Sequence, residues 1–312
     1  MKKIIIGILA LVCLPAAAVY IFIPAKLTLL SQIKPGSSSG TLQRATGASD
    51  LRHRWLPVTG KQLSKTAYTL DDCTYIFPAD NSISNAVIIE YKKMQVASFI
   101  STEPTDDSVI LNWVLNRQSS YNPVSRIQDL YKLKHIKKTN EKILASLLSF
   151  VNNNKTVYGI NIKRTVQTDS TLITYRSTAD TYPSVELIYC KLELLKQYAQ
   201  ANGAAINKPP MLNITQTGKS SWDYMVALPI NKELENRGDI LAKRMFAGGK
   251  ILETENISGG FKTVDRFVEV LDLYRRDFNY ISPAIPFQSL ITDRAKETDS
   301  SKWITRLYYP IY

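Results

Sequence analysis

Cysteine and histidine are scarce in this chain. Its 312 residues include three cysteines, Cys13, Cys73 and Cys190, and two histidines, His53 and His135. These residues are far apart and form no CxxC pair, so we expect neither a disulfide framework nor a metal site built from thiolates and imidazoles.

Common catalytic and nucleotide-binding patterns are also missing. The chain contains no HExxH, no Walker loop and no GxGxxG. The segment 36–40 reads Gly-Ser-Ser-Ser-Gly and matches GxSxG, but a nucleophile elbow needs a parallel sheet and a partner histidine, and only His135 lies far downstream. We interpret the segment as a turn, and the sequence predicts no cofactor, no metal and no catalytic residue.

Basic residues outnumber acidic ones by 39 to 27, which gives a formal net charge of +12. Such an excess can indicate nucleic acid or an anionic membrane surface as a partner. The densest basic run, Lys132–Lys138, precedes an apolar helix, and no recognition helix or aromatic–basic motif accompanies it. We interpret this run as a solvated face and expect no nucleic-acid partner.

The beginning of the chain carries a long uncharged run. Twenty residues, Ile4–Ile23, separate Lys3 from Pro24, and as a helix they would span about 30 Å, the thickness of a bilayer core. Small residues at 16–18 leave a cleaved signal peptide as the alternative. The sequence predicts an uncleaved anchor over residues 1–26 that contacts lipid. It also predicts a single-pass protein of the bacterial inner membrane, with its domains on the extracytoplasmic side.

Residues 27–165 are typical of a first α+β domain, with one strand, a helical stretch, a series of strands and a strong final helix. Thr139 or Asn140 is the expected N-cap of that final helix. The predicted elements are a strand at 27–33, a helical stretch ending at 55, strands at 68–77, 86–91, 97–102 and 109–116, and a helix at 140–151.

This order resembles the START-like (SRPBCC) helix-grip fold. The residues that carry the resemblance are Trp55, Trp113, the segment Asn122–Arg126 and the helix Lys137–Val151. The resemblance implies a hydrophobic cavity between helix and sheet that binds or transforms apolar ligands.

Residues 168–312 contain an internal repeat. Leu172–Tyr175 and the following helix recur 79 residues later, at Ile251–Thr254 and the helix after it. The closing strands Trp222–Ile230 and Trp303–Ile311 begin with tryptophans 81 residues apart. The sequence therefore predicts strand–helix–strand–strand twice, paired about a pseudo-twofold axis with a ligand cleft between the halves.

This arrangement resembles the GyrI-like, or AraC-type effector-binding, domain. The motifs that carry the resemblance are Tyr182-Pro183, Ala227–Ile230, Leu290–Asp293 and the final strand. The family binds small, often cationic and aromatic, molecules, and often has a glutamate in the last strand. Here Arg306 stands in its place, which implies either an anionic ligand or a salt bridge between strands.

We therefore predict a membrane-anchored α+β protein that binds a small hydrophobic or aromatic molecule in the C-terminal cleft. Strand alternation places Arg306 and Tyr308 on one face and Trp303 on the other. A hydrolase or cyclase acting through Glu186, Asp223 or Glu253 is one alternative, and a structural or signalling partner at the membrane is another. The predicted ligand-binding residues are Tyr182, Tyr224, Met225, Phe287, Trp303, Arg306 and Tyr308.

Overall fold

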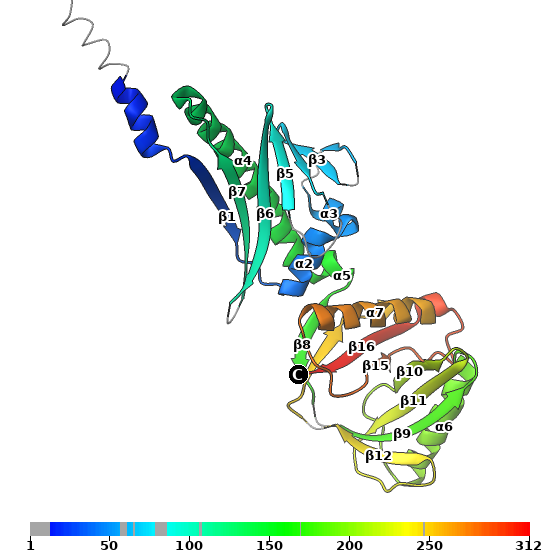
Figure 1. The fold of residues 1–312 in the computed structure, drawn as a ribbon. Coiled ribbons are helices and arrows are strands. Elements are labelled where there is room, and N and C mark those ends of the chain that lie inside the picture. Colours follow the sequence, from blue (N-terminus) through cyan, green and yellow to red (C-terminus); the bar gives the residue numbers. More distant parts are fainter. Residues whose placement is uncertain are drawn as a thin grey trace, which may run out of the picture. The chain divides into compact units, whose positions relative to one another are not determined.

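The structure is a computed structural model that describes residues 13–312, apart from 57–60, 65, 79–85, 106, 107, 169 and 246. The chain is of mixed α+β type with two curled antiparallel sheets (Figure 1). It divides into two compact units, and the division falls between Asn153 and Asn154.

The prediction of a membrane anchor is contradicted. Residues 1–12 of the predicted span lie outside the described residues, and the described helical part covers residues 13–22. In the described part of the chain, no helix is long and apolar enough to cross a membrane. The predicted single-pass inner-membrane location is therefore wrong, and the predicted lipid contact and extracytoplasmic side lose their basis with it.

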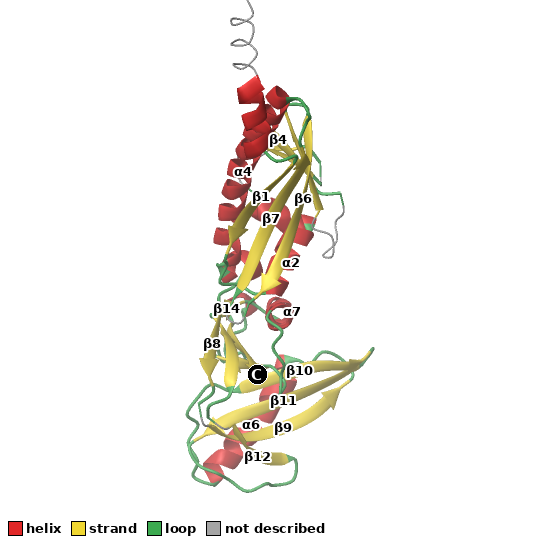
Figure 2. Cartoon of the chain, turned by 60° about the vertical axis from the view of Figure 1, so that its left-hand side comes forward, coloured by secondary structure: helices red, strands yellow, loops and turns green. Residues whose placement is uncertain are grey.

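The first unit is a seven-stranded antiparallel sheet in the order β1-β7-β6-β5-β4-β3-β2, with the long helix α4 running along one face (Figure 2). Its elements are β1 (Lys26–Ile33), α2 (Ser39–Gly47), α3 (Ser49–Trp55), β2 (Lys61–Gln62), β3 (Ala67–Leu70), β4 (Cys73–Ile76), β5 (Ala86–Tyr91), β6 (Met94–Pro104), β7 (Val109–Gln118) and α4 (Pro123–Val151).

Helix α4 starts well before the predicted residue 140. Asn122 is its N-cap, because the Asn122 Oδ1 atom accepts hydrogen bonds from the backbone N–H groups of Val124 and Ser125 at 2.9 and 3.2 Å. The prediction of a cap at Thr139 or Asn140 is therefore wrong, and both residues are buried inside the helix. The apolar stripe extends backwards through Ile136 and Leu133, which places the basic run on the helix.

The second unit contains the predicted repeat. Its sheet order is β12-β9-β11-β10-β15-β16-β13-β8, so β9-α6-β10-β11 and β13-α7-β15-β16 are related halves that meet at the β10–β15 pair. The elements are α5 (Asn154–Tyr158), β8 (Ile162–Val166), β9 (Ser170–Ala179), α6 (Val185–Ala201), β10 (Met211–Gly218), β11 (Ser221–Ile230), β12 (Ile240–Met245), β13 (Lys250–Thr254), β14 (Ile257–Ser258), α7 (Phe261–Asp277), β15 (Phe287–Leu290), a 3-10 turn (Ser300–Lys302) and β16 (Ile304–Ile311).

Strand β8 belongs to the second unit, although the sequence analysis placed it in the first domain. It pairs with β13 over five positions, from Val166 opposite Lys250 to Ile162 opposite Thr254. The ladder makes β8 the outer strand of the second sheet, so the division of the chain falls before α5 rather than after β8.

Alternation along the strands gives the second sheet two distinct faces. Tyr224, Val226 and Leu228 of β11 lie in the core with α6, and the Tyr309 hydroxyl of β16 donates to Asp272 of α7. These residues define the face covered by the helices. The intervening residues, such as Met225 and Tyr308, project from the other side, which we call the open face.

Candidate functional site

Two adjoining cavities lie on the open face, where the halves of the repeat meet. The first has a volume of about 300 Å³ and the second about 200 Å³, and they share Met211, Met245 and Phe287. The first is also lined by Thr165, Val166, Gln167, Thr168, Ser170, Lys208, Pro209, Pro229, Ile251, Glu253, Ser289 and Tyr308. The second is also lined by Leu172, Thr174, Leu212, Asn213, Met225, Ala227, Lys243, Arg244, Ala284, Ile285 and Pro310.

Thioether and aromatic groups form the shared wall. The Phe287 and Tyr308 rings are stacked, with centroids 5.0 Å apart and an interplanar angle of 17°. They face each other because Phe287 lies directly opposite Tyr308 in the β15–β16 ladder. The unbranched side chains of Met211 and Met245 can adapt to ligands of different shape.

Glu253 supplies a carboxylate at the edge of the first cavity, and its side chain is 11% exposed. The Arg306 Nη1 atom donates to it at 2.8 Å, the Tyr308 hydroxyl donates at 3.3 Å, and the Lys163 ammonium lies at 3.4 Å. Burial raises the pKa of Tyr308, and the hydrogen bond from Arg306 opposes that rise. The guanidinium of Arg306 and the ammonium of Lys163 already compensate the negative charge of the Glu253 carboxylate.

Two lysines contribute positive charge to the rims of the cavities. The Lys208 ammonium donates to the hydroxyls of Thr168 and Ser170 at 2.9 and 2.8 Å, and the Lys243 ammonium lies 3.9 Å from the sulfur of Met225. Among the described residues, neither lysine forms an ion pair with a carboxylate. The cavities therefore carry an excess of positive charge, which favours an anionic or neutral ligand over a cationic one.

The seven predicted site residues separate into two groups. Met225, Phe287 and Tyr308 line the cavities. Arg306 projects from the same face but is engaged by Glu253 and by Asn256, whose Oδ1 atom accepts from its Nε and Nη2 atoms at 3.1 and 2.9 Å. Of the two roles that the sequence analysis gave for Arg306, the salt bridge between strands therefore fits better than the binding of an anionic ligand.

The other three predicted residues lie on the side of the helices. Tyr224 is 1% exposed and packs against α6. Tyr182 and Trp303 both pack against the ring of Phe261, the first residue of α7, with centroids 5.0 and 5.4 Å apart. None of the three lines either open-face cavity: Tyr224 projects towards α6, Tyr182 lies in the loop between β9 and α6, and Trp303 directly precedes β16.

The three carboxylates considered for catalysis also lie apart. Asp223 forms an ion pair with Arg176. Glu186 is in the first turn of α6, where hydrogen bonding to Ser184 lowers its pKa. Glu253 alone among them lines a cavity.

Sequence reasoning missed Met211, Met245, Lys208 and Lys243. Alternation along β10 could have identified Met211, since it precedes the buried residue Leu212. Met245 and Lys243 come from β12, which pairs with β9 as β8 pairs with β13, so β12 and β8 occupy equivalent places in the two halves. The predicted repeat began at Leu172 and Ile251, so the sequence analysis left both of these strands out of it.

No family model matches this chain. No curated protein matches it either. Several solved structures resemble about half of its length. The EcmrR C-terminal domain is 17% identical, with a TM-score of 0.41, and the match covers 49% of this chain and 98% of that one.

Two further solved structures match the same share of this chain. A hydrolase from Listeria innocua is 10% identical over 49% of this chain and 92% of its own, with a TM-score of 0.37. SAV2435 bound to tetraphenylphosphonium is 15% identical over 49% and 94%, with a TM-score of 0.31.

At these identities and TM-scores, the GyrI-like resemblance of the second unit stays a prediction from the sequence. Identities this low and TM-scores below 0.5 carry no argument about what this chain binds. The START-like resemblance of the first unit is not shown by these comparisons.

Proposed function

We propose that the second unit binds a small apolar molecule, neutral or anionic, in the paired cavities of its open face. The observation that carries this proposal is the shared wall of Met211, Met245 and Phe287 between two adjoining cavities with lysines at their rims. Together the two volumes reach the range of about 300–1,000 Å³ that is usual for ligand pockets. The apolar wall holds the body of the ligand, and Lys208 and Lys243 attract its acidic or polar end.

A cationic ligand suits this site less well. Glu253 is the acidic side chain that lines the cavities, and Arg306 and Lys163 already compensate its charge. A cation would have to displace one of these partners or lie near an excess of positive charge.

The contacts of Glu253 also count against the hydrolase or cyclase alternative. Its carboxylate accepts hydrogen bonds from a guanidinium and a hydroxyl and lies beside an ammonium. A general base or nucleophile needs a free lone pair directed at the substrate. Binding therefore suits this arrangement better than catalysis.

We also propose a START-like fold for the first unit. Its strand order and the position of α4 along the sheet support this assignment. Between helix and sheet, Tyr75 and Trp113 are 1% and 0% exposed and pack edge to face at 5.8 Å. Since large side chains occupy this space, we assign the ligand to the second unit.

Two probes of similar shape, one anionic and one neutral, test the proposed function. We expect calorimetry on the full chain to show binding of 4-phenylbutanoate and, more weakly, of 4-phenylbutan-1-ol. The variant Lys208→Gln/Lys243→Gln should weaken binding of the acid by about fivefold to tenfold, as expected for two exposed charge contacts. Its binding of the alcohol should hardly change.

Lys219→Gln/Lys232→Gln is the matched control, because both are exposed lysines that line neither cavity and the same amount of charge is lost. Equal weakening in the control would show that only the overall charge matters. If neither acid nor alcohol binds, the binding proposal fails and the structural or signalling role becomes the better account.

A further inference from the structure

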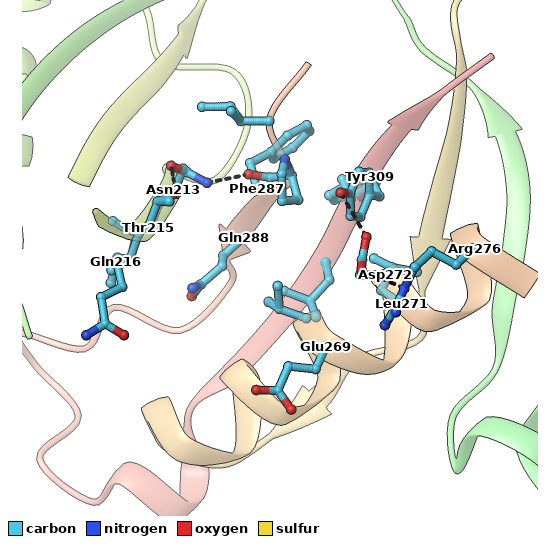
Figure 3. Close-up of a pocket in the computed structure, with 17 residues that line it drawn as sticks. Asn213, Thr215, Gln216, Glu269, Leu271, Asp272, Arg276, Phe287, Gln288 and Tyr309 are labelled. Atoms are coloured by element: carbon cyan, nitrogen blue, oxygen red, sulfur yellow. Dashed lines mark hydrogen bonds and ion pairs between the residues drawn. The ribbon is translucent and has the colours of Figure 1, made fainter. Parts of the chain in front are cut away.

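A separate groove lies beside α7, where the two halves of the second sheet diverge (Figure 3). Strand β10 pairs with β15 only at Met211 and Leu212, so the backbone of the following β10 residues has no strand partner on that side. The resulting space has a volume of about 490 Å³. We call it the α7 groove, and it is lined by Leu212, Asn213, Ile214, Thr215, Gln216, Val268, Glu269, Leu271, Asp272, Arg276, Ile285, Pro286, Phe287, Gln288, Leu307, Tyr308 and Tyr309.

One buried acceptor in the α7 groove has no partner. Gln288 is 4% exposed and lines the groove from β15, and its Oε1 atom accepts no hydrogen bond (Figure 3). The neighbouring amide of Asn213 is in contrast satisfied within the wall. Its Nδ2 atom donates to the carbonyl oxygen of Pro286 at 2.8 Å, and its Oδ1 atom accepts from the Thr215 hydroxyl at 3.2 Å. A buried acceptor without a partner is costly, and a ligand that donates a hydrogen bond removes that cost.

The charge of the groove is unbalanced at Glu269. Asp272 is compensated, because it accepts from the Arg275 Nε atom at 2.9 Å and forms an ion pair with Arg276 at 3.1 Å. Glu269, one turn earlier on α7, is exposed and forms no ion pair among the described residues. Its carboxylate and the Gln288 oxygen therefore give the groove two free acceptors, one of them charged (Figure 3).

We propose that the α7 groove is a second binding site, for an apolar molecule that carries an amine. The ammonium group donates hydrogen bonds to the Oε1 atom of Gln288 and to the carboxylate of Glu269. The apolar body packs against side chains such as Ile214, Val268 and Leu271. Phe287 borders both this groove and the open-face cavities, so the two sites are neighbours with opposite charge preference.

The test measures dissociation constants of 4-phenylbutylamine by calorimetry on the full chain. We expect Gln288→Leu, which removes the acceptor and keeps an apolar side chain, to weaken binding by about tenfold or more. Glu269→Gln should weaken binding by about threefold to tenfold. Since Glu269 is exposed, this second variant decides the matter if Gln288→Leu does not fold.

Glu193→Gln is the matched control, because Glu193 is an exposed glutamate on the other helix and its loss changes the net charge equally. The proposal is overturned if the amine does not bind the wild-type chain, or if the groove variants bind it as well as the control does.

The proposal for each site can be refuted without affecting the proposal for the other. Lys208→Gln/Lys243→Gln should leave binding of the amine intact, and the groove variants should leave binding of 4-phenylbutanoate intact. A marked change of amine binding in the lysine variant, in either direction, would place the amine on the open face and overturn the second site.

Discussion

Buried polar side chains of the second unit gather around the ring of Phe261. Arg294 is 3% exposed, and its guanidinium carbon lies 5.1 and 5.0 Å from the ring centroids of Phe261 and Trp303. Its Nη2 atom donates to the Thr305 hydroxyl at 2.7 Å, and burial lowers its pKa. Aromatic faces here take the place of a carboxylate partner, which is how a cation can remain charged in an apolar surrounding.

Asp265 belongs to the same region and leads to a prediction about pH. Burial raises its pKa above the ordinary 3.8, and the hydrogen bond from the Tyr182 hydroxyl only partly opposes this. The folded state therefore holds the proton more tightly than the unfolded state does. Stability relative to Asp265→Asn should be greatest below pH 3.8 and should fall as the pH rises through the folded-state pKa.

Urea denaturation of wild type and Asp265→Asn at several pH values, from below 3.8 to neutrality, measures this difference. The asparagine keeps an oxygen that accepts from Tyr182 but does not titrate, which makes it the appropriate reference. A difference that stays constant or grows with pH would contradict the assignment.

At the scale of elements, the turn before α7 depends on glycine. Gly259 has a φ of +137°, and its N–H donates to the carbonyl oxygen of Trp303 at 3.0 Å. A Cβ atom there would lie 2.8 Å from the Thr263 Oγ1 atom and 2.9 Å from its Cβ atom. Because Gly260 caps α7 without a side-chain hydrogen bond, the start of this helix depends on the backbone and on packing.

We expect Gly259→Ala to lower the free energy of unfolding by about 1–3 kcal/mol, from the strained φ and the contact with Thr263. Adding Thr263→Ala should recover only the part of the steric loss that comes from the Thr263 Oγ1 and Cγ2 atoms, because alanine keeps the Cβ atom. Gly249→Ala is the control, since its nearest neighbour would be the Gln167 Cβ atom at 3.9 Å and its φ is not in the strained region. Chemical denaturation measures all three, and equal losses in Gly259→Ala and Gly249→Ala would refute the explanation.

At the scale of the whole molecule, each unit has its own sheet and its own buried residues. The structural division places α5 and β8 with the second unit. Tyr158 of α5 is buried and donates to the Asp277 carboxylate at 2.7 Å, and β8 covers the outer edge of β13. These contacts make residues 154–166 part of the second core.

This division predicts how fragments behave. A fragment of residues 154–312 should fold alone with a cooperative transition, because its sheet and core are complete. A fragment of residues 168–312 should be less stable by several kcal/mol, since it loses the β8 ladder and the buried side chains before it, at roughly 1.5–3 kcal/mol for each large apolar residue. Thermal denaturation followed by circular dichroism compares the two, and equal stability would place the boundary after β8.

The sequence by itself determined the repeat, the helical stripes and the faces of the strands. Arg306 and Tyr308 project together and Trp303 projects away, as alternation predicts, because side-chain direction depends only on position within a strand. The stripe of α6 could be read for the same reason, since its spacing of three and four residues is local.

Only the tertiary structure decided which distant residues meet. Arg306 is engaged by Glu253 of another strand, and Lys243 reaches the cavity from β12, which pairs with β9 far earlier in the chain. The start of α4 and the membership of β8 also depended on packing partners far along the chain. Local periodicity contains no information about which strand lies beside which, and the charge and shape of a binding site arise from that adjacency.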